Sequence, residues 1–434
     1  MRIESQETIS LSQRELPSRK PIELVWNEKE KKLWTEKGLR VFLGLNTALG
    51  GKLIDFNLLP EDKRPKGIVT IPIEEAREHL SDLKDTLPII PTDETTFLRS
   101  KIQSVEALVI EIERRKHGRK GPFKDVYEKT LGLSPEFVSQ ETINSVKEQL
   151  EECLIKANIR GNCWVDKLQE HRKLKRIGKN GNFIDGEKII GRIKETAASN
   201  IATLNKKGII IPDVSYGVES EEKNEYWKCW VDGDSESGFR LRINTHPRHG
   251  STWIEGTPER YSSHEVLAHL VQMQRWHKAI KEGSLNPLMG LTTIPGPEQF
   301  QLEGFAQTIH FFAGLNWSPD TEISWLDVVL HTLAWQHTFY LYESGVSSEK
   351  AAKEYKKIYP LAKERQIRDE MERVSRNPYR RTYQDVYGPA LTTFWVISQE
   401  LGEKERLIFI EKMLQGPKNP QQINTIYRKI LNNR

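Results

Sequence analysis

The chain has 434 residues, of which 37% are hydrophobic and 29% charged, and its formal net charge is +4. This composition is typical of a soluble protein with one large domain or two to three ordinary ones, and the small net charge gives no reason to expect a nucleic-acid partner. No run of about 18 apolar residues is present, so we expect no membrane-spanning helix and no membrane partner. The polar N-terminus and three scattered cysteines, Cys153, Cys163 and Cys229, favour a reduced, cytoplasmic protein.

The first 95 residues are predicted to form a helical region. A charged run predicts a helix from about Asn27 to Leu49, and a second helix is expected at Pro72, because proline suits the start of a helix. The segment PIIPTDETT (88–96) contains two prolines and predicts a linker or a sharp loop. We therefore divide the chain into an N-terminal helical region, residues 1–95, and a main domain, residues 96–434.

Apolar residues at helical spacing predict further helices over residues 97–116, 139–158 and 162–175. The basic runs RRKHGRK and RKLKR lie near the ends of these segments. We interpret them as solvated helix faces and their flanks, and a polyanion-binding site is the alternative.

The pattern changes over residues 207–245, where KGIIIPDV, EYWKCWV and GFRLRINT are short and rich in β-branched and aromatic residues. These segments predict a small antiparallel β-sheet with a hairpin across DGDSESG. We expect GFRLRINT to be an edge strand that can pair with an extended peptide. Helical patterns then continue to the C-terminus, so the predicted fold is mainly α, a helical bundle with an active-site cleft and a small sheet.

The segment YSSHEVLAHLVQMQRW holds the residues best suited to bind a metal ion. His264 and His269 offer imidazole ligands, and Glu265 can serve as the general base that deprotonates a metal-activated water. The usual zinc-peptidase pattern is H-E-x-x-H, whereas this chain has one additional residue between the histidines. On a regular helix five residues turn by about 500°, which leaves the two imidazoles about 140° apart. A π-bulge or a local unwinding between them would bring the imidazoles together.

A third ligand is expected from the segment QLEGFAQTI, whose apolar residues suggest another helix. Glu303 would complete a His–His–Glu set and leave one position open for water. Gly304 beside it would allow a close approach between two helices. The alternative interpretation is that Glu303 is a surface carboxylate and that both histidines are core or surface residues.

His246 and His249 lie in the loop NTHPRHG and are expected at its surface, with a second ion site as the alternative.

These motifs resemble those of glutamate-type zincins. One branch, which includes the tyrosine carboxypeptidases that trim tubulin tails, carries H-E-x-x-T-H followed by E-G-L-A. A related bacterial peptidase family carries H-E-x-x-P-G-H followed by E-G-W-A. HEVLAH (264–269) has the spacing of the first branch, with Ala268 in place of threonine, and LEGFA (302–306) is similar to the second motif of both. The likeness extends more loosely to GFRLRINT, to LDVVLHTLAW (326–335) and to RVSRNPYRRTYQDVYG (373–388).

The resemblance implies roles for further residues. His331 would face the cleft, and Tyr383 or Tyr387 would donate a hydrogen bond to the developing oxyanion. Arg373 or Arg376 would bind a substrate carboxylate, with a surface or structural role as the alternative. The family often places an aspartate four residues after the third ligand, but Gln307 stands there in this chain.

The sequence therefore predicts a zinc-dependent metallopeptidase with one Zn²⁺ per chain, which hydrolyses a peptide or protein substrate, with carboxypeptidase action favoured by the closest motif spacing. Two alternatives stay open. The chain can be a catalytically inactive zincin-fold scaffold or binding protein, or a zinc hydrolase that cleaves a non-peptide amide. The sequence does not indicate an oligomeric state.

Overall fold

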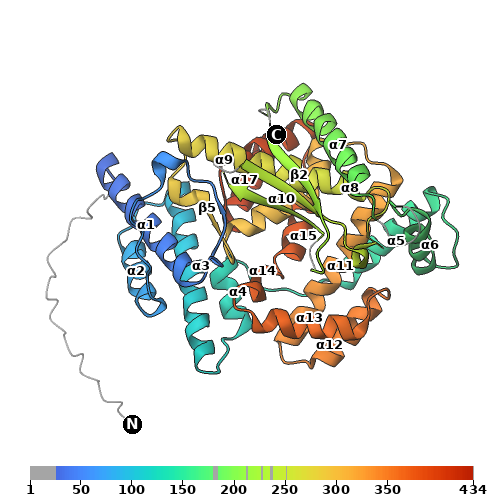
Figure 1. Ribbon diagram of the computed structural model, residues 1–434, viewed down its shortest axis with the longest axis horizontal. Helices are drawn as coiled ribbons and strands as arrows, with labels where there is room; N and C mark the ends of the chain where they lie inside the picture. The colour runs from blue at the N-terminus through green and yellow to red at the C-terminus, as the bar shows by residue number, and fades with distance from the viewer. Residues whose placement is uncertain are drawn as a thin grey trace, which may run out of the picture.

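The computed structural model describes residues 26–178, 184–211, 214–225, 228–234, 238–250 and 252–433. In these residues the chain is mainly helical and contains two small β-sheets, so the predicted fold class is confirmed. Figure 1 shows the N-terminal helices at one end of the molecule and the larger sheet beside the central helices. Within the described ranges, no helix combines the length and apolar character needed to cross a membrane.

The α-helices that precede the larger sheet are α1 (Glu28–Ala48), α2 (Ile73–Asp85), α3 (Asp93–Lys116), α4 (Phe123–Leu131), α5 (Gln140–Lys156), α6 (Trp164–Leu174) and α7 (Gly186–Lys206). Those that follow it are α8 (Thr257–Tyr261), α9 (Val271–Lys281), α10 (Glu298–Ala313), α11 (Pro319–Glu343), α12 (Ser348–Ile358), α13 (Glu364–Arg376), α14 (Arg380–Tyr383), α15 (Tyr387–Glu400), α16 (Glu403–Leu414) and α17 (Pro420–Asn432). A π-helix, η3 (Ser262–Leu270), joins α8 to α9, and short 3₁₀ turns are η1 (Glu61–Lys63), η2 (Pro247–His249) and η4 (Pro287–Gly290).

The ends of the first helices follow from local capping. Asn27 caps α1 by accepting a hydrogen bond from the Glu30 backbone, and α2 begins directly after Pro72. α3 begins four residues earlier than predicted, because the Thr92 side chain caps it through the backbone N–H of Thr95. The predicted boundary at residue 95 thus falls within the first turn of α3, and the domain division itself stays a prediction.

The larger sheet consists of β2 (Tyr216–Glu221), β3 (Cys229–Asp234) and β4 (Gly238–Asn244), in the order β2-β4-β3. β3 and β4 form the predicted antiparallel hairpin, and the turn residues 235–237 lie outside the described residues. The prediction that GFRLRINT is an edge strand is wrong, because β2 pairs in parallel with the other side of β4 and makes it the central strand. KGIIIPDV does not form the predicted strand either: α7 extends to Lys206, residues 209–211 are irregular, and residues 212–213 lie outside the described residues.

The smaller sheet joins the N-terminal region to the main domain. β1 (Ile54–Asn57) pairs antiparallel with β5 (Leu291–Thr293), which directly precedes α10. β1 also contacts β3 of the larger sheet. A strand from the first 95 residues is therefore held beside both the larger sheet and the helix that carries Glu303.

Two hydrophobic cores lie on opposite sides of the π-helix η3. Leu267, Ala268 and the following Val271 pack into a core built mainly from α4, α5, α10, α11 and the C-terminal helices. Val266 and Leu270 pack into a second core built from α1, α2, α3, α7, β4 and α9. Apolar side chains thus cover both sides of η3, while His264, Glu265 and His269 line a cavity between the two cores.

Candidate metal centre

The π-helix brings the two histidines together. The backbone N–H of Val271 bonds to the carbonyl of Val266, five residues earlier, which is the hydrogen bond that defines a π-turn. This wider turn removes the angular offset that five residues create on a regular α-helix. The His264 and His269 rings lie edge to face with their centroids 4.8 Å apart. The backbone distortion that the spacing demands is therefore present.

Glu303 joins the histidines from α10. One ligand atom from each of the three residues lies within 4.8 Å of the other two, and Glu303 Oε2 is 3.7 Å from His264 Nε2. α10 passes close enough because residue 304 is glycine: a Cβ atom there would lie 2.4 Å from Phe394 Cδ2 on α15. The predicted role of Gly304 in close helix packing is confirmed.

The polar groups of this site fit a divalent cation. Glu303 Oε2 is buried and has no hydrogen-bond partner among the described residues, although an unpaired buried carboxylate oxygen is unfavourable. Tetrahedral zinc with ligands at about 2.0–2.1 Å separates its ligand atoms by about 3.3 Å, so the observed spacing needs only a modest contraction. Two imidazoles and a carboxylate are the donor set of a catalytic rather than a structural zinc site.

The protonation states also suit metal binding. Burial lowers the pKa of His269 to about 4 and lowers the pKa of His264 well below its usual value, so both rings are neutral at pH 7 and can donate a lone pair. Burial raises the pKa of Glu265 to about 8, and the nearby Glu303 carboxylate adds to the shift. Burial likewise raises the pKa of Glu303 to about 8. A cation between them would favour the ionised carboxylates.

The three candidate ligands and Glu265 line a cavity of about 110 Å³, together with Tyr383 and Tyr387. The Tyr383 hydroxyl donates to Glu303 Oε1 at 3.1 Å, and the two tyrosine hydroxyls lie 2.8 Å apart. Tyr387 also lines two adjoining hollows, whereas Tyr383 lines neither. Hydrogen bonding by both tyrosines opposes the rise in the pKa of Glu303. Of the two, only Tyr387 also faces the space that a substrate can enter.

The other predicted site residues lie elsewhere. His331 on α11 is exposed and lines two hollows beside the metal centre but not the metal cavity itself, so its role stays a prediction. Arg373 and Arg376 lie on the exposed face of α13, where each pairs with a glutamate of the same helix, and neither lines these cavities. His249 is not a surface residue: it is buried, and its Nε2 lies 2.9 Å from the Glu225 carbonyl.

Several residues of the cavity were not predicted from the sequence. β1 contributes Asp55 and Phe56, from a segment more than 200 residues before the histidines. The edge strand β3 contributes Cys229 and Trp230, and burial raises the pKa of the Cys229 thiol well above its usual value, so it is a neutral thiol. Gln299 on α10 donates to Asp55 Oδ2 at 3.4 Å. No local signal marks these residues, because β-pairing and helix packing bring them to the site.

The groups that usually orient metal-binding histidines differ in this chain. Gln307, at the position where the family often has an aspartate, is buried, and neither side-chain amide atom has a hydrogen-bond partner within the described ranges. His269 Nδ1 is also buried without one. In the described part of the chain, the orientation of the imidazoles therefore depends on packing between the two cores rather than on a carboxylate.

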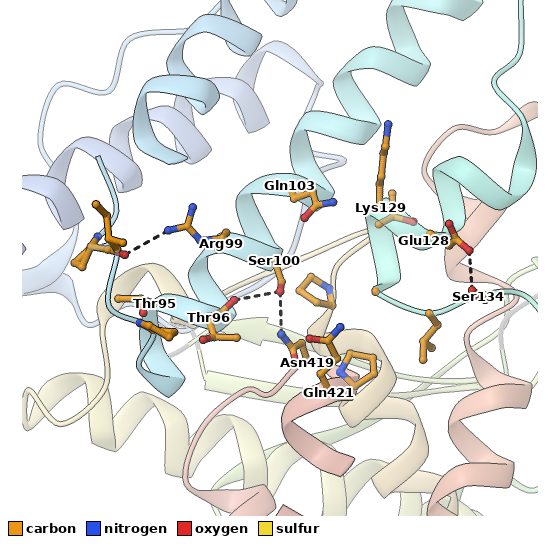
Figure 2. A pocket seen from close by; sticks show the side chains of 18 residues that line it. Thr95, Thr96, Arg99, Ser100, Gln103, Glu128, Lys129, Ser134, Asn419 and Gln421 are labelled. Carbon is orange, nitrogen blue, oxygen red and sulfur yellow. Dashed lines mark hydrogen bonds between the residues drawn. The ribbon is translucent and has the colours of Figure 1, made fainter. Parts of the chain in front are cut away.

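Another hollow, of about 540 Å³, is built from different residues. Figure 2 shows Thr95, Arg99, Ser100 and Gln103 from α3 along one side and Asn419 from the start of α17 along another. Asn419 Nδ2 donates to Ser100 Oγ at 2.9 Å, which ties the two helices together. This hollow has no histidine or cysteine in its lining and shares no lining residue with the metal centre, so it offers no comparable donor set.

Comparison with known proteins supports the fold alone. No protein-family model matches the chain, and no curated protein matches it. A crystal structure from Colwellia psychrerythraea, described as a candidate lipoprotein, is similar with a TM-score of 0.57 and 13% identity over 95% of this chain and 78% of that one. A candidate lipoprotein of unknown function from Shewanella oneidensis gives a TM-score of 0.51 and 13% identity over 84% of this chain and 74% of that one.

Proposed function

We propose that the protein is a zinc-dependent metallopeptidase. The observation that supports this most strongly is the convergence of His264, His269 and Glu303 through a π-helix, with ligand atoms within 4.8 Å of one another. A π-turn in a buried helix is unfavourable without a compensating role, and here it aligns two imidazoles that would otherwise diverge. A scaffold protein without a metal would have no use for this distortion or for the unpaired Glu303 oxygen.

Each residue of the site would have a defined part in hydrolysis. Zinc held by the three ligands would acidify a water molecule and polarise the scissile carbonyl. Glu265 would accept the proton of the attacking water and pass it to the leaving amine. Tyr387 would donate a hydrogen bond to the developing oxyanion, while Tyr383 holds Glu303 in position.

The sheet provides a means of binding an extended peptide. β3 is one of the two edge strands of the larger sheet, and its residues Cys229, Trp230 and Val231 line the metal cavity. A substrate strand paired with the outer edge of β3 would place its backbone beside the ligands. Peptide hydrolysis is therefore favoured over cleavage of a small amide. As part of the same proposal, we place the protein in the cytoplasm.

The test is the zinc content of the purified protein together with peptide hydrolysis. We expect about one zinc per chain, lost in His269→Ala and in Glu303→Ala and retained in Glu265→Gln. Glu265→Gln should lower turnover by about 10²–10⁴-fold, because only the proton-transfer group is removed. If the wild type binds no zinc after zinc is supplied, the scaffold alternative takes its place. If zinc binds but only non-peptide amides are cleaved, the third alternative holds.

A further inference from the structure

A second, larger cavity adjoins the metal centre. It has a volume of about 560 Å³ and lies between the end of α8, α11 and the start of α13. Arg260 and Tyr261 line both this cavity and a smaller hollow of about 220 Å³, and the smaller hollow is also lined by His264 and Tyr387 of the metal centre. The larger cavity therefore borders a hollow that lies on the Tyr387 side of the metal centre.

The larger cavity is rich in cations. Among the residues that the structure describes, its lining includes Arg172, Lys228, Arg248, Arg260 and Lys363 and a single carboxylate, that of Asp327. That carboxylate is already engaged. Asp327 accepts from Arg172 at 2.5 Å and from the Tyr359 hydroxyl at 2.7 Å.

The remaining cations lack acidic partners. No carboxylate of the described residues lies within 4.0 Å of the head group of Lys228, Arg248, Arg260 or Lys363. Arg260 is held in place by the Tyr261 ring, 4.1 Å from its guanidinium carbon, and by a 3.3 Å bond from Nε to Ser324 Oγ. We name Lys228, Arg248, Arg260 and Lys363 the basic cluster.

The position of Lys228 shows that the basic cluster is electrostatically unfavourable without an anion. Lys228 is partly buried, directly before β3. Burial lowers its pKa to about 8, and repulsion by Arg260 adds to the shift. Arg248 and Lys363 are exposed at the rim. A partly buried cation that has a shifted pKa, lines a cavity and lacks an acidic partner is a candidate for a binding site.

We propose that the basic cluster binds a carboxylate of the peptide substrate, with Arg260 and Lys228 as the principal contacts. This inference rests on the proposed peptidase function and names its substrate class, peptides that carry a negative charge at one side of the scissile bond. An arginine fork matches the two oxygens of a carboxylate, and a lysine adds a point charge. The carboxylate is either the C-terminus of the substrate or an Asp or Glu side chain.

The basic cluster sets a preferred position for the acidic group of a substrate. Its cations line the larger cavity, to one side of the metal centre. An acidic group held there would fix the direction in which a peptide lies across the site.

The test measures binding rather than turnover, so that it is independent of catalysis. Four fluorescent peptides would share one sequence and differ only in a free or amidated C-terminus and in Glu or Gln at one fixed position. Their Kd values would be measured by fluorescence anisotropy on full-length, zinc-supplied Glu265→Gln protein. Lys228→Met and Arg260→Gln would be added to this background, with Lys194→Met as the control, because Lys194 is exposed on α7 and does not line the cavity.

We expect the free-acid or Glu peptide to bind about tenfold more tightly than its neutral counterpart, in keeping with one charge-assisted interaction. Lys228→Met and Arg260→Gln should abolish this preference and leave the affinity for the neutral peptide and the zinc content unchanged, whereas Lys194→Met should retain it. Loss of preference on amidation identifies the C-terminus as the source, and loss on Glu-to-Gln exchange identifies a side chain. Equal binding of all four peptides to the parent protein, or a preference that survives both substitutions, would overturn the proposal. If the wild-type protein binds no zinc and hydrolyses no peptide, but the preference for the free-acid or Glu peptide remains, only the peptidase function is rejected.

Discussion

The contact between α10 and α15 at Gly304 sets the position of Glu303, and Gly304→Ala tests it. The added Cβ would lie 2.4 Å from Phe394 Cδ2 and 3.0 Å from the Ala390 carbonyl oxygen. Phe394 is fully buried, and the Ala390 oxygen belongs to the backbone, so neither can move aside easily. Overpacking of this kind destabilises by about 1–3 kcal/mol, and the better helix propensity of alanine offsets about 1 kcal/mol. Since both contacts are severe, we expect the upper part of the range, a net loss of about 2 kcal/mol.

Gly191→Ala is the matched control. Gly191 also lies inside a helix, α7, and a Cβ atom there would meet no other atom within 4 Å. The substitution should therefore stabilise the protein by up to about 1 kcal/mol. Urea unfolding followed by circular dichroism gives both values, and the zinc content of the same samples shows whether the shift of α10 displaces Glu303. If Gly304→Ala unfolds at the same urea concentration as Gly191→Ala, the close packing is not what positions this helix.

Three further predictions concern the site and its surroundings. Tyr387→Phe should lower kcat by about 10²–10³-fold with zinc retained, whereas Tyr383→Phe should weaken zinc binding by releasing Glu303. If kcat measurements and zinc titrations show the reverse pattern, the two tyrosines have exchanged roles. Deletion of Ala268 restores H-E-x-x-H spacing, so it should convert the π-turn to an α-turn and retain one zinc per chain; loss of zinc would show that the π-turn itself shapes the site. Burial lowers the pKa of His249 to about 4, so its contribution to stability is present above pH 6.5 and is lost as the pH falls toward 4. His249→Gln should therefore reduce the slope of the unfolding free energy against pH by up to about 1.4 kcal/mol per pH unit over that range. An unchanged slope in the variant would contradict the lowered pKa of His249.

The sequence was most informative where structure depends on neighbours in the chain. The starts of α1 and α2 and the β3–β4 hairpin follow from local residues, and the predictions for them are confirmed. The histidine spacing was informative in a different way. The five-residue spacing is incompatible with metal binding on a regular α-helix and therefore predicted a π-bulge or a local unwinding, and η3 is a π-helix. A motif that conflicts with ideal geometry can thus predict a backbone distortion as specifically as a capping box predicts a helix end.

The predictions that proved wrong concern features that depend on contacts between distant segments of the chain. β4 has the alternating pattern of a half-buried strand, with Phe239, Leu241 and Ile243 in the core, and this pattern is the same for an edge and a central strand. Its parallel partner β2 has the sequence YGVESE, which carries little strand propensity. Likewise, the sequence shows that arginines are abundant but not which of them lack a carboxylate. Arg373 and Arg376 resemble a family motif yet pair along their own helix, whereas Arg260, four residues before His264, was not singled out.

The same long-range contacts bear on the role of the first 95 residues, which the sequence alone does not define. β1 forms one wall of the metal cavity through Asp55 and Phe56, and it is held there by pairing with β5. α1 and α2 share a core with Val266 and Leu270 on the π-helix. Removal of this region would open one wall of the metal cavity and expose the part of that core that α1 and α2 cover, while α7 and α9 still pack on η3. The N-terminal region is therefore better understood as part of the support of the metal centre than as a detachable lid.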